Sequence, residues 1–174
     1  STGLSPTIGP GGTIFIGSHL LKSVLAFSPS GTLLWSFYAG ADIGTTVAVS
    51  ASGALFFGAG TAVFALTPSG TLAWKSAVSG TVTSTPSLST DGAVFFGAGD
   101  GNVYKLDAAT GSRQWETTLG GNLASSPAVD RQGAVYIGAP NGTTYALAPS
   151  DGAVRWTFAS GGSIATAPAK RSLA

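Results

Sequence analysis

The sequence predicts an all-β fold made of repeated four-stranded units, and three observations carry this prediction. Short apolar runs rich in β-branched and aromatic residues alternate with turns rich in Gly, Ser and Asp along all 174 residues. Glycine and tryptophan recur together at a regular interval along the chain. Hydrophobic residues make up 44% of the chain and charged residues 9%, which excludes a disordered chain because such chains lack apolar surface to bury.

The unit is clearest in the stretch over residues 91–115. Asp91-Gly92 is a turn dipeptide, and the apolar run that follows it predicts a strand buried on both faces. A second turn, at residues 100–102, joins this strand to the next one in a hairpin. A third turn leads into an outer strand that carries Trp115. Each unit therefore supplies an inner segment, a hairpin and an outer strand.

The spacing within this unit occurs four times along the chain. The offsets from an anchor, usually proline, to the first glycine, from the first glycine to the second, and from the third glycine to the tryptophan are the same in every repeat. Only the gap between the second and third glycines changes, being shorter in the second repeat, so turns absorb the length differences. A one-residue slip inside a strand would turn every side chain to the wrong face. The glycine–tryptophan pairs are Gly31 and Trp35, Gly70 and Trp74, Gly111 and Trp115, and Gly152 and Trp156.

A period of roughly 40 residues with four strands per unit is typical of a β-propeller blade. We therefore expect residues 1–174 to form a single propeller segment of four antiparallel four-stranded blades. The repeats cover approximately residues 6–46, 47–85, 86–126 and 127–167. A surplus inner strand is expected at residues 164–170, since the anchor sequence occurs a fifth time there.

The repeat resembles the pyrroloquinoline-quinone-type (PQQ-like) propeller repeat, whose motif is Ala-x-Asp-x-x-Thr-Gly-x-x-x-Trp. Asp107, Thr110, Gly111 and Trp115 match this motif, with Lys105 in place of its alanine. The other three repeats keep the alanine, glycine and tryptophan but lose the aspartate and threonine. The resemblance implies that each tryptophan wedges between adjacent blades. The four tryptophans and the four glycines named above are therefore the expected blade-docking residues. It also implies a bacterial, extracytoplasmic location.

Propellers of this family commonly have seven or eight blades, so four repeats make half of an eight-bladed ring. A half ring leaves two apolar blade faces in water, and at about 500 Å² each this would cost about 12 kcal/mol per face. Three arrangements would cover them: a homodimer of two half rings, self-closure into a four-bladed ring, or the missing half of a longer parent. We favour the homodimer because two copies about a twofold axis remove both open faces.

The bulk composition argues against several classes of partner. A net charge of +1 with scattered basic residues makes nucleic acid and anionic membranes poor partners. The longest mostly apolar run, residues 54–66, is too short for membrane insertion. The chain has no cysteine, which excludes disulfides and thiolate metal sites.

Few side chains could support catalysis, and we expect no catalytic, cofactor-binding or metal site. His19 is the only histidine, and its loop contains no carboxylate to orient it as a base. The two leucines of this loop, Leu20 and Leu21, are interpreted as packing on the neighbouring blade, with an exposed contact loop as the alternative. Five of the seven carboxylates lie in turns beside or near glycine, where turn formation explains them: Asp91, Asp100, Asp107, Asp130 and Asp151.

The sequence thus favours a non-catalytic propeller scaffold or protein-interaction module. One alternative is a fragment of a quinone-dependent oxidoreductase, although the axial acid cluster and paired cysteines implied for such enzymes are not seen. A second is a carbohydrate-binding propeller, for which Tyr38 and Tyr145 would be the remaining aromatic candidates. A third is a segment with no independent evolved function. The sequence does not indicate a small-molecule ligand.

Overall fold

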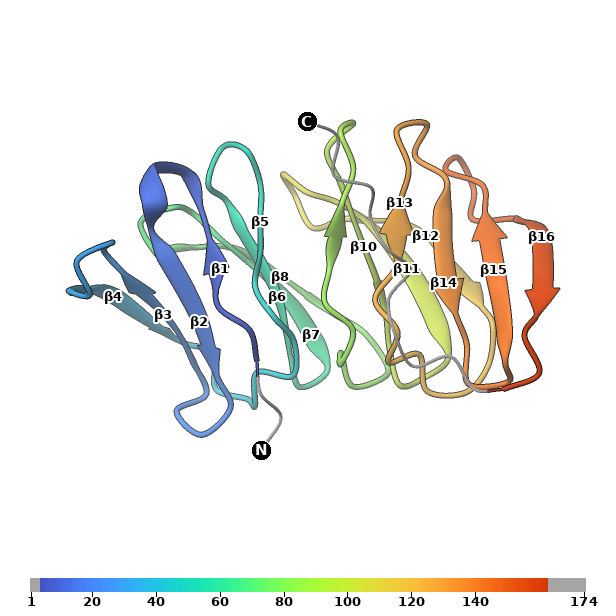
Figure 1. Cartoon of the computed structure of the whole chain (residues 1–174), viewed down its shortest axis with the longest axis horizontal. Helices are drawn as coiled ribbons and strands as arrows, with labels where there is room; N and C mark the ends of the chain where they lie inside the picture. The colour runs from blue at the N-terminus through green and yellow to red at the C-terminus, as the bar shows by residue number, and fades with distance from the viewer. Residues whose placement is uncertain (1–3, 163–174) are drawn as a thin grey trace.

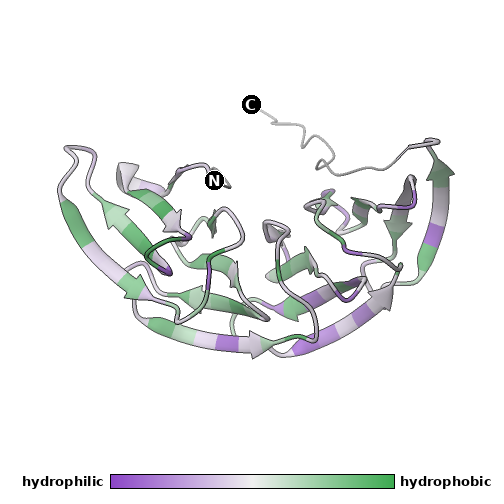
Figure 2. Cartoon of the chain, turned by 90° about the horizontal axis from the view of Figure 1, so that it is seen from below, coloured by the Kyte–Doolittle hydropathy of each residue, from purple (hydrophilic) through white to green (hydrophobic). Residues whose placement is uncertain are grey.

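The computed structural model describes residues 4–162 as four antiparallel sheets of four strands each. The sheets are the blades of a β-propeller and stand side by side along an open arc, with β4 and β16 at its two ends (Figures 1 and 2). The predicted all-β propeller fold is confirmed. The inner strand expected at residues 164–170 lies outside the described residues.

The blades follow the chain in order, each running from inner to outer strand. Blade 1 contains β1 (Thr7–Ile8), the short 3-10 helix η1 (Pro10–Gly12), β2 (Ile14–Ser18), β3 (Ser23–Phe27) and β4 (Leu33–Tyr38). Blade 2 contains β5 (Ala48–Val49), β6 (Leu55–Ala59), β7 (Ala62–Leu66) and β8 (Leu72–Ala77). Blade 3 contains β9 (Ser87–Leu88), β10 (Ala93–Gly97), β11 (Asn102–Asp107) and β12 (Arg113–Thr118). Blade 4 contains β13 (Ala128–Val129), β14 (Val135–Gly138), β15 (Thr143–Leu147) and β16 (Val154–Ala159).

The hydrogen-bonded register is the same in every blade. Each outer strand pairs with the third strand so that the tryptophan lies opposite the motif's alanine position, as in Trp35 opposite Ala26 and Trp115 opposite Lys105. One step further, a register shift interrupts all four of these pairs at the same place. A shift of this kind bends and twists the strand locally. It therefore sets the angle at which each outer strand presents its tryptophan.

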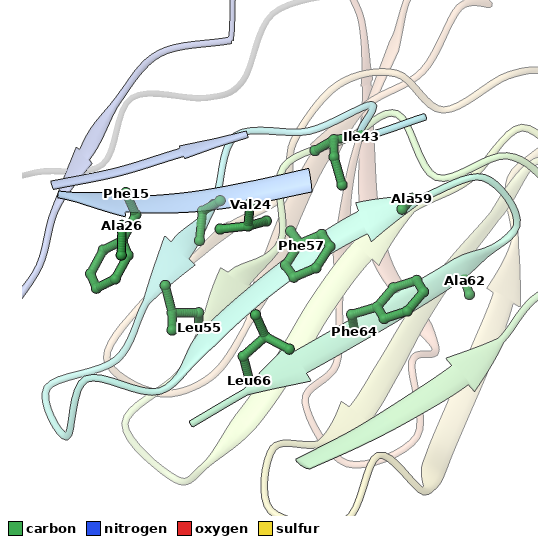
Figure 3. Packing of buried hydrophobic residues seen from close by; sticks show 11 residues of the cluster. Phe15, Val24, Ala26, Ile43, Leu55, Phe57, Ala59, Ala62, Phe64 and Leu66 are labelled. Atoms are coloured by element: carbon green, nitrogen blue, oxygen red, sulfur yellow. The ribbon is translucent and has the colours of Figure 1, made fainter. Parts of the chain in front are cut away.

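The hydrophobic core lies between blades rather than within one sheet. Side chains from β2 and β3 meet side chains from β6 and β7 in the cluster of Figure 3, in which Phe57 and Phe64 stack with ring centroids 5.3 Å apart. Equivalent clusters fill the spaces between blades 2 and 3 and between blades 3 and 4. Every residue of β6, β7 and β10 is buried, as expected for strands covered on both faces.

The two end blades are covered on one face only. In β2 the side chains alternate, with Phe15 buried against blade 2 and its neighbours Ile14 and Ile16 half-buried. The whole of β16 is exposed. Among residues 4–162 no helix is long and apolar enough to cross a bilayer. The positions of greatest interest are therefore the junctions between blades and the two faces that lack a neighbour.

Candidate functional site

A tryptophan side chain bridges each of the three junctions between neighbouring blades. In every case the indole Nε1 donates a hydrogen bond to a backbone carbonyl in the turn before the next blade's outer strand. The bonds run from Trp35 to Pro68 O at 3.2 Å, from Trp74 to Ala108 O at 2.9 Å, and from Trp115 to Pro149 O at 3.1 Å. Buried indole N–H groups need such a partner, so the bond helps to set the contact between blades.

A glycine in the same turn gives the indole room to approach. A Cβ built on Gly70 would lie 2.5 Å from Trp35, one on Gly111 2.6 Å from Trp74, and one on Gly152 2.7 Å from Trp115. These glycines also have φ between 72° and 82°, a conformation that L side chains rarely adopt. Glycine is thus required at these positions both because the indole lies so close and because φ is positive.

Each tryptophan is also held by an aromatic ring of its own blade. Four equivalent pairs have centroid separations of 5.8 to 5.9 Å and tilted planes: Phe15 with Trp35, Phe56 with Trp74, Phe95 with Trp115, and Tyr136 with Trp156. Blade 4 therefore positions its tryptophan as the other blades do. The difference at blade 4 is that no described blade follows it.

Blade 4 presents an apolar face with no described blade against it. This face is made of Tyr136, Thr144, Trp156 and Phe158 around the buried Ala146. Trp156 is 47% exposed, whereas Trp74 and Trp115 are 9% and 8% exposed. Phe158 is 64% exposed. Its counterpart Phe37 in blade 1 packs edge-on against Phe57 and Phe64 of blade 2.

Blade 1 presents the complementary uncovered face, made of Ile14, Ile16, Leu25 and Phe27. These side chains are only partly buried, whereas their counterparts in blade 2 are at most 3% exposed: Leu55, Phe57, Phe64 and Leu66. At the edge of the same face, Gly31 has no atom within 4 Å of a built Cβ. None of the side chains that define either end face is charged, so both ends are suited to apolar contacts.

A further junction contact comes from Lys105, which replaces the alanine of the repeat motif. Its side chain is buried between blades 3 and 4, and Nζ donates a hydrogen bond to Pro149 O at 2.9 Å. The same carbonyl accepts the bond from Trp115. Thr117 adds a hydrogen bond to Gly152 O at 2.7 Å. Sequence comparison of the repeats marked Lys105 as a departure but did not assign it this role.

The only histidine lies beside a carboxylate that its own loop does not contain. Asp42, from the loop after β4, places Oδ2 3.5 Å from His19 Nε2 and Oδ1 3.8 Å from Lys22 Nζ. These side chains border a cavity of about 640 Å³. Sequence reasoning missed the pair because two strands, β3 and β4, separate the carboxylate from the histidine along the chain. Both partners are about half exposed, and ion pairs of this kind contribute little to stability.

The leucines of the His19 loop are exposed, so the interpretation that both pack on the neighbouring blade is wrong. Leu20 is 90% and Leu21 58% exposed. The loop turns at Lys22, which has φ 51°, and Ser23 Oγ donates to Leu21 O at 2.8 Å. The loop is thus held by its own hydrogen bond and by Asp42, while both leucines face solvent.

The aspartates of the turns are used in local hydrogen bonds. Asp107 Oδ1 accepts bonds from the Thr110 hydroxyl and from the amides of Thr110 and Ala109. The Thr110 hydroxyl, followed by its amide, holds the pKa of Asp107 below its ordinary value. Asp107 and Asp91 border a second cavity of about 490 Å³ between blades 2 and 3. Within residues 4–162 no group of three His, Cys, Asp or Glu side chains is placed to hold a metal.

Comparison with known proteins identifies the family. A family model of the PQQ type, described as outer membrane protein assembly factor BamB, matches residues 22–163. The chain belongs to this family. A search of curated protein sequences finds no match. Membership in the BamB-type repeat family agrees with the docking geometry, since the matched residues contain all four tryptophans.

Three solved structures show the same fold. BamB from Moraxella catarrhalis superimposes with a TM-score of 0.77 at 21% identity, over 89% of this chain and 47% of that one. The quinohemoprotein alcohol dehydrogenase ADHIIG from Pseudomonas putida HK5 gives 0.73 at 18% identity, over 90% and 34%. The computationally designed Ika8 protein gives 0.82 at 19% identity, over 96% and 52%. The chain therefore spans about half of BamB and of Ika8, and about a third of the dehydrogenase.

Proposed function

We propose that the chain is a non-catalytic propeller scaffold or protein-interaction module, and that two copies join as half rings to complete it. The observation that carries this proposal is the pair of uncovered apolar faces at opposite ends of the arc. Trp156 and Phe158 project from one end, while Ile16 and Leu25 lie half-buried at the other. If both faces stay in water, the chain does not gain the free energy that burial of apolar surface provides at each internal junction.

A second copy is the partner that fits both ends at once. The blade 4 face of one chain is equivalent to the faces that blades 1, 2 and 3 turn toward their successors. The uncovered face of blade 1 is equivalent to the faces that blades 2, 3 and 4 turn toward the blades before them. In a twofold dimer each copy supplies one face of each kind, and two identical junctions close the ring. Two copies also match the length of BamB and Ika8, of which one copy spans 47% and 52%.

Self-closure into a four-bladed ring is disfavoured by the shape of the arc. Figure 2 shows blades 1 and 4 at its opposite ends, and Trp156 stays 47% exposed. The missing half of a longer parent remains the competing arrangement, because it would present the same kind of blade faces. It differs from the dimer in a measurable way, since an isolated half would then be a monomer or would aggregate through its ends.

A non-catalytic role is supported by how the polar side chains are used. Asp107, Asp130 and Asp151 each accept backbone amide bonds within their own turns. The PQQ-type family includes dehydrogenases, and ADHIIG has a similar fold, so an oxidoreductase fragment is the alternative. Titration with pyrroloquinoline quinone and Ca²⁺ separates the two. A saturable spectral change would favour the alternative.

The family also supports an extracytoplasmic, bacterial setting. BamB is described as an outer membrane protein assembly factor, and a role in assembling other proteins suits a propeller with exposed loops. The exposed leucines of the His19 loop offer one such contact. Fusion of the chain to a reporter that is active only after export would test this part of the proposal.

The dimer is tested by measuring mass with light scattering across a hundredfold dilution. We expect a species with twice the 17.1 kDa mass of one chain, which gives way to the single mass at the lowest concentrations. A mass that stays at one chain throughout would contradict the proposed closure. A mass that grows without limit would indicate end-to-end polymers instead of a closed ring.

A further inference from the structure

We infer that Trp156 of each copy docks on the Gly31 turn of the other, with its Nε1 donating to the carbonyl of Pro29. This inference rests on the proposed dimer and specifies its contacts. Among the four docking glycines, Gly31 alone has no atom within 4 Å of a built Cβ. Among the tryptophans, Trp156 is the one on the face without a following described blade. The arc thus has one free indole and one free glycine turn per copy.

The Gly31 turn already has the conformation of an occupied docking turn. Gly31 N donates to Ser28 O at 2.9 Å, as Gly70 N donates to Thr67 O at 3.0 Å. The side chains two residues apart also bond alike, Ser28 with Ser30 at 2.8 Å and Thr67 with Ser69 at 2.9 Å. The turn between β3 and β4 has the same length as the turn between β7 and β8, so the residues of these two turns correspond one to one.

The acceptor for the free indole follows from this correspondence. Trp35 Nε1 donates to Pro68 O, two residues before Gly70. The residue two before Gly31 is Pro29, which lies in the exposed turn. Its carbonyl belongs to a turn that is already ordered by its own hydrogen bonds. Docking therefore costs little additional ordering of the backbone, which favours association of preformed surfaces.

Phe158 supplies the second contact of the same junction. Its counterpart Phe37 meets Phe57 and Phe64 at centroid distances of 6.4 and 6.2 Å. The residues of blade 1 at the positions of Phe57 and Phe64 are Ile16 and Leu25. Both are half-buried in one copy. The indole and the phenyl ring sit two residues apart on β16, so they project to the same side and reach the turn and the sheet together.

These two contacts determine how the copies are aligned. Sliding the partner along β16 by one residue, about 3.3 Å, would move its Gly31 turn away from the indole and its Ile16 and Leu25 away from Phe158. Because each copy carries one donor face and one acceptor face, the same alignment forms at both junctions. In a closed pair, the two junctions would therefore have the same contacts.

The test is a matched pair of glycine substitutions, Gly31→Ala and Gly92→Ala. Both glycines have positive φ, 86° and 81°, and neither has an atom within 4 Å of a built Cβ, so both substitutions strain one copy alike. Only Gly31 lies where the partner's indole would sit. We expect Gly31→Ala to raise the dimer dissociation constant at least tenfold, and Gly92→Ala to change it less than about twofold, by sedimentation velocity.

A second variant keeps the test decisive if Gly31→Ala folds poorly. Trp156→Phe retains an aromatic ring but removes the N–H, so the hydrogen bond is lost at both junctions. We expect loss of the two bonds to raise the dissociation constant by about tenfold or more. If the wild type dimerises and neither Gly31→Ala nor Trp156→Phe changes the dissociation constant, the inferred contacts are wrong although the dimer itself is real. A wild-type chain that is monomeric at every concentration would overturn both proposals.

Discussion

Trp115 lies so close to Gly152 of the following blade that a Cβ on the glycine would be 2.7 Å from the indole. The same indole donates to Pro149 O at 3.1 Å. The indole of one blade thus packs directly against the backbone of a glycine in the next blade. Equivalent contacts join Trp35 with Gly70 and Trp74 with Gly111. The same type of contact therefore occurs at each of the three junctions between described blades.

Removing a covered indole should destabilise the fold much more than removing the free one. We expect Trp115→Ala to lower the free energy of unfolding by about 3 to 5 kcal/mol, because the side chain is 8% exposed and leaves a cavity. Trp156→Ala is the matched control, since that side chain is 47% exposed. Urea unfolding at protein concentrations low enough to keep the chain monomeric measures both. Equal losses would contradict the docking role of Trp115.

The glycine of an occupied junction should tolerate a methyl group less well than an open glycine. Both Gly152→Ala and Gly92→Ala place alanine at positive φ, which costs about 1 to 2 kcal/mol. Gly152→Ala adds clashes with the Thr117 hydroxyl and with the Trp115 ring, and we expect it to cost about 1 to 3 kcal/mol more. Thermal or urea unfolding of the two variants gives the difference. If Gly152→Ala lowers the free energy of unfolding no more than Gly92→Ala does, glycine is required at position 152 only for the turn conformation and not for contact with the indole.

The sequence predicted the fold well because its signals are local and repeated. Turn glycines and apolar runs at constant spacing mark strands such as β10 and β11 directly. The glycine partner of each tryptophan was not predicted: the repeat groups Trp115 with Gly111, whereas in the structure Trp115 contacts Gly152 of the next blade. Contacts between residues without a repeated counterpart could not be predicted. Asp42 reaches His19 from another loop. Lys105 occupies an alanine position, and its bond to Pro149 O joins it to a turn of the next blade that the repeat pattern does not place beside it.

The two donors to Pro149 O should be energetically coupled. Lys105→Met removes one of them and leaves the carbonyl bonded to Trp115, so we expect a loss below about 1 kcal/mol. Trp115→Phe removes the other and leaves the carbonyl bonded to Lys105. The double variant leaves this carbonyl without either donor, and we expect a coupling free energy of about 0.5 to 3 kcal/mol in a double-mutant cycle. Strictly additive losses would show that the shared acceptor does not matter.

Asp107 should make stability depend on acid pH. Its pKa is lowered from 3.8 in the folded chain, chiefly by the Thr110 hydroxyl, so the folded state favours the carboxylate. This stabilisation is present above the unfolded value and is lost as the pH falls through the folded one. We expect Asp107→Asn to lower stability at neutral pH and to flatten the acid limb of a stability–pH profile. Thr110→Val should reproduce part of this change, whereas profiles parallel to the wild type would contradict it.

The environment of Trp156 tests the central claim most directly. In chains labelled with 5-fluorotryptophan, each of the four tryptophans gives one ¹⁹F resonance, and Trp156→Phe assigns the one of interest. We predict that the H₂O-to-D₂O shift of the Trp156 resonance is large in dilute protein and falls to that of Trp74 and Trp115 as concentration rises. A Trp156 resonance that stays solvent-sensitive in concentrated protein would contradict the closure of two half rings through this face.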